Sequence, residues 1–295
     1  ADMVCLVAIV ALATLFLLPA LLPGHTLLPL GLEGGIAPWN KQVDRQAQNL
    51  LLSDPFYQYY PFRYQGVQAL RQGQLLLWNP YVLGGHPALG DALGQTFYPP
   101  NVFASLLFPL ARGWVLLIWG HLVLTGVLMY GYLRQTGLRP ASGLLGATAW
   151  MLNANIVVWL ETPHFLSTLA WLPGVFWLLE KARATGRWRF VAGAGLMYGA
   201  MVLAGQTQYA IGAAWLIGLW GLFQTVVRSL QGRRVALQPL MMVALVGILG
   251  VGMGMVQLAP SVELTQLSHR ANPTLSLFQS RWPLRHSVTL WLPDF

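Results

Sequence analysis

The chain has 295 residues, of which 56% are hydrophobic and only 9% are charged. An average soluble domain is about 25% charged, so this composition excludes an ordinary soluble protein and predicts an all-α polytopic membrane protein. The net charge of +8 does not indicate nucleic-acid binding, because the basic residues lie in short loops between apolar segments. The single cysteine, Cys5, excludes an intrachain disulfide and a multi-cysteine metal site.

Long uncharged segments predict about seven transmembrane helices. A bilayer core of roughly 30 Å needs about 20 apolar residues in a helix. The uncharged segment 190–227 would be about 57 Å long as one helix, so we expect it to fold back at Gly205-Gln206-Thr207-Gln208. For the first segment, a cleaved signal peptide is the alternative. The predicted spans are residues 3–22, 113–133, 141–160, 163–179, 190–205, 209–227 and 235–258.

The loops between these segments predict an orientation. Every second loop is basic, and the turns at Glu161–Pro163 and Gly205–Gln208 contain no Lys or Arg. Cytoplasmic loops carry the excess of basic residues, so we expect the N-terminus inside and residues after Leu258 outside. The basic residues on the cytoplasmic side would be Arg134, Arg139, Lys181, Arg183, Arg187, Arg189, Arg228, Arg233 and Arg234.

Residues 23–112 would form a large extracytoplasmic first loop that contains interfacial helices. The loop is rich in aromatic residues, which favours an ordered segment covering a surface. Residues 61–72 read as a short helix with Pro61 in its first turn. Residues 101–109 are too few to cross a bilayer and would be interfacial or re-entrant.

Asp54 and Glu161 are the candidate catalytic residues, each at a predicted membrane boundary. A carboxylate there could act as a general base toward an attacking hydroxyl. Asp54 precedes Pro55 and a predicted helix, so a helix N-cap is the alternative for it. Glu161 could be a solvated acid of a hairpin turn instead. Together with His164 it could also ligate a divalent metal, but the spacing supplies no third ligand, so no metal is assigned.

Two polar loops supply further candidates for substrate binding. Gly84-Gly85-His86-Pro87 and Gly90-Asp91 are most simply explained as turns, from which His86 and Asp91 could project into a pocket. Gln206 and Gln208 could contact sugar hydroxyls, or only complete the hairpin turn. The full set of expected substrate-binding residues is Tyr57, Gln58, Arg63, His86, Asp91, His164, Gln206 and Gln208.

Other features are interpreted as packing. Gly195-x-x-x-Gly199 and Gly250-x-x-x-Gly254 would allow two helices to approach closely. His121, within the second predicted span, would hydrogen-bond to a neighbouring helix or mark a functional position. Charged residues do not occur in the middle of the predicted spans, which disfavours an ion pump.

The chain resembles the YfhO-like family of bacterial membrane proteins, which belongs with the GT-C glycosyltransferases. The resemblance rests on an apolar first span and on several motifs spread along the chain. The family's long C-terminal half is absent, so we expect a fragment of a longer protein. The motifs are Asp54-Pro55-Phe56-Tyr57-Gln58-Tyr59-Tyr60-Pro61, Trp78-Asn79-Pro80, Gly84-Gly85-His86-Pro87, Phe97-Tyr98-Pro99-Pro100-Asn101 and Leu290-Trp291-Leu292-Pro293-Asp294-Phe295.

The resemblance implies inverting transfer of a sugar from a polyprenyl-phosphate donor to an extracytoplasmic acceptor, at the bacterial cytoplasmic membrane. Asp54 would be the base and Glu161 the second acidic group, while Arg63 could stabilise the leaving phosphate. Expected partners are membrane lipids, the donor lipid and other membrane proteins. Two alternatives stay open: a non-catalytic subunit of a larger membrane complex, and a lipid or polysaccharide transporter.

Overall fold

The computed structural model describes residues 1–35, 37, 52–82, 84–232, 237–268, 271, 283 and 286–288. The protein is mostly helical, as expected for an all-α membrane protein. Four described helical segments are long and apolar enough to cross a membrane, whereas α1 and α10 are apolar but shorter. The four segments are Leu110–Gln135, Pro140–Val158, Thr207–Leu230 and Gln238–Gln266.

From α4 onward the helices follow one another with short connections. The α-helices are α1 (Asp2–Phe16), α2 (Leu18–Leu21), α3 (Tyr60–Arg71), α4 (Pro99–Leu107), α5 (Leu110–Gln135), α6 (Pro140–Met151), α7 (Ala154–Val158), α8 (Pro163–Leu169), α9 (Leu172–Thr185), α10 (Trp188–Leu203), α11 (Thr207–Leu230) and α12 (Gln238–Gln266). Shorter elements are the 3-10 helices η1 (Leu30–Gly35) and η5 (Ala92–Gly94), the π-helical turn η4 (Pro55–Tyr59), and the strands β1 (Trp78–Asn79) and β2 (His86–Pro87).

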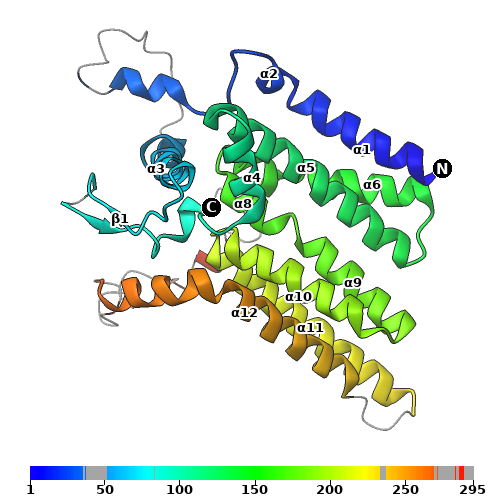
Figure 1. Ribbon diagram of the computed structural model, residues 1–295. Coiled ribbons are helices and arrows are strands. Elements are labelled where there is room, and N and C mark those ends of the chain that lie inside the picture. The colour runs from blue at the N-terminus through cyan, green and yellow to red at the C-terminus, as the bar shows by residue number, and fades with distance from the viewer. Residues whose placement is uncertain are drawn as a thin grey trace.

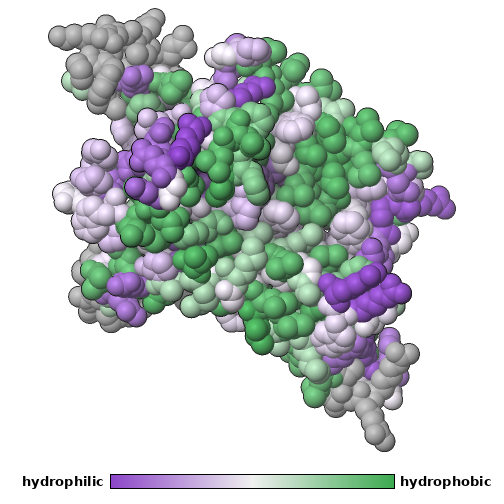
Figure 2. Space-filling model, viewed as in Figure 1, coloured by the Kyte–Doolittle hydropathy of each residue, from purple (hydrophilic) through white to green (hydrophobic). Residues whose placement is uncertain are grey.

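The long helices form a bundle in which α1, α5, α6, α9, α10, α11 and α12 run alongside one another (Figure 1). One hydrophobic core lies among α1, α5, α6 and α8, and a second lies among α9, α10, α11 and α12. Hydrophobic surface covers the visible flank of the bundle, and hydrophilic residues gather toward its two ends (Figure 2). This distribution fits a bundle whose middle faces lipid tails.

The tightest helix pair is α10 with α12, and the two glycine motifs form its interface. A Cβ at Gly195 or Gly199 would meet the side chain of Leu249 or Met253. A Cβ at Gly250 would lie 2.3 Å from the Tyr198 ring and 3.1 Å from the Gly199 backbone nitrogen. The prediction that these motifs serve close packing is therefore confirmed.

The uncharged segment 190–227 folds back where the sequence predicted. Helix α10 ends at Leu203 and α11 begins at Thr207, with Gly205 between them at a φ of +96°. A Cβ at Gly205 would lie 2.4 Å from the Ala92 carbonyl oxygen, so only glycine lets η5 pack against this turn.

Several predicted spans differ from the structure. The first segment breaks after Phe16 and resumes as the short α2, which begins one residue before Pro19. Helix α12 does not end near Leu258 but continues to Gln266 with Pro260 inside it. The predicted span 141–160 is divided between α6, which ends at Met151, and α7. The predicted span 163–179 is divided between α8 and α9, and α9 continues to Thr185. The start of the last span at residue 235 and the closing motif 290–295 lie outside the described residues.

The described part of the segment between α2 and α5 covers one end of the bundle, here called the loop end (Figure 1). The predicted short helix is α3, but β1 and β2 pair as a small antiparallel hairpin that the sequence did not predict. Two hydrogen bonds fix this segment on α12: Gln257 Nε2 donates to the Leu89 carbonyl at 2.7 Å, and Ser261 Oγ donates to the Gly90 carbonyl at 2.9 Å.

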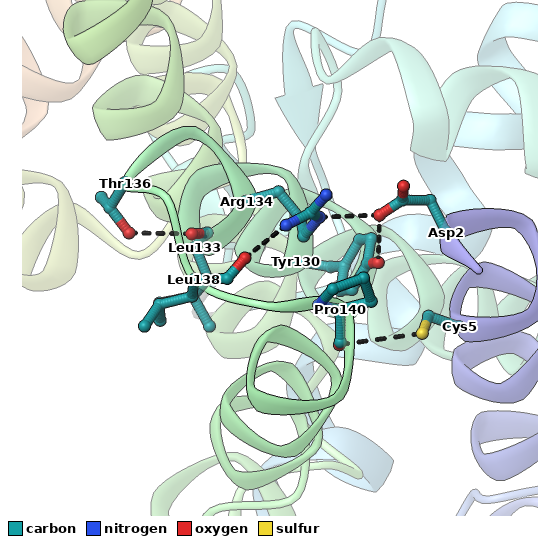
Figure 3. A network of polar contacts seen from close by, with 8 residues as sticks. All are labelled: Asp2, Cys5, Tyr130, Leu133, Arg134, Thr136, Leu138 and Pro140. Carbon is teal, nitrogen blue, oxygen red and sulfur yellow. Dashed lines mark hydrogen bonds and ion pairs between the residues drawn. The ribbon is translucent and has the colours of Figure 1, made fainter.

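The opposite end of the bundle, here called the basic end, holds the ends of α5, α9 and α11 and the start of α1. Figure 3 shows the polar contacts there, centred on Asp2. Asp2 Oδ1 accepts from Arg134 Nε at 2.7 Å and from the Tyr130 hydroxyl at 2.5 Å. These contacts fasten the start of α1 to the end of α5 through exposed charged groups.

Candidate functional site

A cavity of about 920 Å³ opens at the loop end of the bundle. Its wall combines side chains from η4 and α3, the β2 strand, the η5 segment, the start of α8, the α10–α11 turn and the end of α12. The lining residues are Tyr57, Gln58, Tyr59, Phe62, Val82, His86, Gly90, Asp91, Ala92, Leu93, His164, Phe165, Gly205, Gln206, Thr207, Gln208, Ser261, Leu264, Thr265 and Ser268.

Most of the expected substrate-binding residues meet in this cavity, although they come from four separate parts of the chain. Arg63 lies outside the lining, and so do both expected catalytic residues, Asp54 and Glu161. The predicted residues on the wall are Tyr57, Gln58, His86, Asp91, His164, Gln206 and Gln208.

Asp54 is exposed and does not line the cavity, but it hydrogen-bonds to Tyr59, which does. The interpretation of Asp54 as a helix N-cap is wrong, because its backbone is already helical and its side chain makes no capping hydrogen bond. Instead, its Oδ2 accepts the Tyr59 hydroxyl at 3.2 Å. The π-helical turn explains the pairing, since it brings residue i+5 beneath residue i. Burial and the Asp54 charge raise the pKa of Tyr59, which therefore keeps its proton.

Glu161 is half-buried in the turn before α8. Burial raises the pKa of its carboxyl. His164, three residues on, is buried to 1% exposure and lies in the cavity wall. Glu161 and His164 therefore do not share the cavity, although they are neighbours in sequence.

His164 presents an unsatisfied polar atom at this wall. Its Nδ1 is buried without a hydrogen-bond partner among the described residues. The ring packs edge-on against Tyr59 at 4.4 Å between centroids and is tilted against Phe165 at 4.7 Å. A buried polar atom without a partner is costly, so this position suits a ligand or a water that supplies the missing bond.

Arg63 is buried to 3% exposure directly behind the cavity wall. It follows Phe62 in α3 and lies one turn after Tyr59, and both of these residues line the cavity. Its guanidinium donates to Gln95 Oε1 and lies 4.5 Å from the centroid of the Trp114 ring, while its Nε has no partner. Among the described residues, no carboxylate forms an ion pair with it.

The Arg63 charge persists despite this burial. Burial lowers its pKa to about 9, which still leaves the guanidinium protonated at neutral pH. A buried cation without a counter-charge is unfavourable by several kcal/mol, as a general estimate. The loop end therefore holds a positive charge that a bound anion would neutralise.

Sequence reasoning missed the contribution of α12. Ser261, Leu264 and Thr265 lie beyond the predicted end of the last span, yet they form part of the wall. Their spacing was the available signal, because residues 261, 264 and 265 share one helical face. His121 is explained by packing: its Nε2 bonds the Tyr98 hydroxyl and its Nδ1 faces the Leu117 carbonyl at 2.7 Å.

Within the described ranges, no group of three or more His, Cys, Asp or Glu side chains gathers that could hold a metal ion. Comparison with models of protein families and with curated protein sequences gave no match to this chain. The resemblance to the YfhO-like family therefore stays a prediction.

Proposed function

We propose that this chain is the membrane domain of a GT-C type glycosyltransferase, which transfers a sugar from a polyprenyl-phosphate donor to an extracytoplasmic acceptor. The observation that carries the proposal is the cavity of about 920 Å³ at the loop end, with the uncompensated Arg63 charge behind it. The volume lies within the range of ligand pockets, roughly 300–1,000 Å³. Aromatic and amide side chains on its wall suit a sugar, and the positive charge suits a phosphate.

The proposed topology places this cavity outside the cell. Seven helices would cross the cytoplasmic membrane of a bacterium, including α1, α9 and α10, which are short for a full crossing. The described basic residues of the connecting loops lie at the ends of α5, α9 and α11 and the starts of α6 and α10, opposite the loop end. The positive-inside rule then makes the basic end cytoplasmic.

In the proposed reaction, the donor phosphate binds on the Arg63 side of the cavity. The acceptor hydroxyl attacks C1 of the sugar, the bond from C1 to the phosphate oxygen breaks, and polyprenyl phosphate leaves with that electron pair. The positive charge of Arg63 would stabilise the negative charge that grows on the leaving group, and His164 would add a hydrogen bond in the tautomer that carries a proton on Nδ1. By the resemblance, Asp54 would accept the proton, with Glu161 as a second acidic group.

Mass spectrometry of lipids bound to the purified full-length protein tests the proposal. We expect a polyprenyl-phosphate sugar among them, and transfer of its sugar when acceptor polysaccharide is added. Finding only phospholipids, with no turnover of an added polyprenyl-phosphate sugar, would contradict the proposal. Tight donor binding without any turnover would instead favour the non-catalytic subunit.

A further inference from the structure

One carboxylate does lie in the cavity wall, and it belongs to neither residue assigned by the resemblance. Asp91 is the only Asp or Glu among the described lining residues. A general base must come within hydrogen-bond reach of the hydroxyl it deprotonates, roughly 2.6–3.2 Å or one water away. An acceptor bound in this cavity can meet that condition at Asp91, which lines it, whereas Asp54 lies outside the lining.

The backbone around Asp91 is held rigidly. Asp91 caps η5, because its Oδ1 accepts from the Leu93 backbone N–H at 2.9 Å. Gln95 ends that turn in the left-handed conformation at a φ of 53°, and its Nε2 donates to the Ala204 carbonyl at 2.7 Å. On the other side, Gly90 packs so closely on α12 that a Cβ there would lie 2.7 Å from Leu264.

The second oxygen of Asp91 remains available. Among the described residues, its Oδ2 has only a long contact from Gln58 Nε2, at 3.5 Å. No Lys or Arg belongs to the described part of the lining, and neither ion pair among the described residues involves Asp91. The carboxylate thus keeps one oxygen for an incoming hydroxyl, while the other oxygen fixes its orientation.

Asp54 contacts the cavity wall from outside, through Tyr59. Its contact is the Tyr59 hydroxyl, and the Tyr59 ring in turn packs on His164. Asp54 can therefore hold Tyr59 and His164 in place without touching a bound substrate. This makes it a positioning residue.

On the basis of the proposed function, we propose that Asp91 is the catalytic base of the transfer reaction, and that Asp54 positions the cavity wall through Tyr59. As the new bond forms between the acceptor oxygen and C1, Asp91 Oδ2 takes the hydroxyl proton. The bond from C1 to the phosphate oxygen breaks, and polyprenyl phosphate leaves with the electron pair. The neutral carboxylic acid then returns its proton to solvent through the open cavity.

The test compares sugar transfer by the full-length protein and its variants Asp91→Asn, Asp54→Asn and Tyr59→Phe. Asp91→Asn should lower kcat by about 10²–10⁴-fold, the usual effect of losing a general base. Its melting temperature and its affinity for undecaprenyl phosphate should stay unchanged, because the Asn oxygen still accepts from the Leu93 N–H. Asp54→Asn and Tyr59→Phe should each lower kcat about tenfold. The double variant should lower kcat no further than either single variant.

Glu263→Gln is the matched control, since Glu263 is an exposed carboxylate of α12 outside the lining. If Asp91→Asn unfolds, Asp91→Ser replaces it, because serine also accepts a hydrogen bond from the N–H two residues on. Normal transfer by a folded Asp91 variant, or a loss of 100-fold or more confined to Asp54→Asn, would overturn the assignment. A wild-type protein that transfers no sugar would instead contradict the proposed function, and with it the assignment of Asp91 as the base.

Discussion

At the basic end of the bundle Arg134 and Arg183 are paired with Asp2 and Glu180, whereas at the loop end Arg63 is buried with no carboxylate partner among the described residues. The exposed pairs contribute little to stability and are readily replaced by water contacts. The buried Arg63 is unfavourable for the fold unless an anion binds beside it. This contrast supports our proposal that the loop end binds a ligand, whereas the ion pair between Asp2 and Arg134 at the basic end fastens α1 to α5.

The largest effect expected from the contrast is on donor binding. Replacing Arg63 with Gln removes the buried charge next to the cavity. A unit charge roughly 6–8 Å from a phosphate contributes about 2–3 kcal/mol at an effective dielectric constant of about 20. Affinity for undecaprenyl phosphate, measured by native mass spectrometry, should therefore fall about 30-fold to 100-fold.

Arg71→Gln is the matched control for Arg63→Gln. Arg71 lies in the same helix but is exposed, and its guanidinium donates to the Ser105 carbonyl at 3.1 Å. Arg71→Gln should leave the affinity for undecaprenyl phosphate within about twofold of the wild type, because solvent screens an exposed charge. Equal losses in the two variants would show that general surface charge, and not the buried Arg63, attracts the lipid.

A second prediction concerns the close packing of α10 against α12, in the bundle between the two ends. Gly250→Leu forces a side chain into the Tyr198 ring and the α10 backbone, and overpacking of this kind costs about 1–3 kcal/mol. Gly252 is exposed in the same helix and a Cβ there would meet nothing within 4 Å, so Gly252→Leu should be nearly neutral. Thermal unfolding in detergent measures both, and equal melting temperatures would contradict the close α10–α12 packing.

A smaller effect is expected from Glu161 at the loop end. Its pKa is raised by burial above the ordinary value of 4.5, so the folded state holds the proton more tightly than the unfolded state. The free energy of unfolding should therefore fall as the pH rises from 4.5 through the raised pKa. Glu161→Gln should flatten this part of the pH profile, and Glu263→Gln should not. An unchanged profile in Glu161→Gln would assign the pH dependence to another group.

The smallest effect is expected at the basic end. Asp2→Asn removes the exposed ion pair with Arg134 but keeps an oxygen that can accept from Tyr130 (Figure 3). The melting temperature should change much less than in Gly250→Leu, and donor affinity should not change. A large loss of donor affinity in Asp2→Asn would contradict the division of roles between the two ends.

The sequence predicted the helices better than it predicted the cavity wall. Uncharged segments and basic loops placed most helices, because burial in lipid excludes charge over a helix length. The end of α12 escaped prediction because Pro260 usually stops a helix. Here the hydroxyls of Ser261 and Thr265 bond to the carbonyls one turn earlier, at 2.9 Å and 2.7 Å, while the helix continues.

The sequence predicted most of the substrate-binding side chains that line the cavity, but it did not predict which carboxylate lies there. Topology alone brings polar residues to one end of a bundle, which is why Gln58, His86 and Gln208 meet. Which carboxylate faces inward depends on local geometry that the sequence does not show. The π-helical turn pairs Asp54 with Tyr59, and the η5 turn aims Asp91 into the cavity. Likewise, the burial of Arg63 depends on Trp114, which is distant in sequence.

The most direct measurement is a cryo-electron-microscopy structure of the full-length protein with undecaprenyl phosphate bound. We expect density for the phosphate inside the loop-end cavity, next to His164 and on the side of Arg63, with its isoprenoid chain leaving toward the lipid-facing flank. Phosphate density at the basic end, among Arg134, Arg183 and their neighbours, with the loop-end cavity holding only water, would contradict the account.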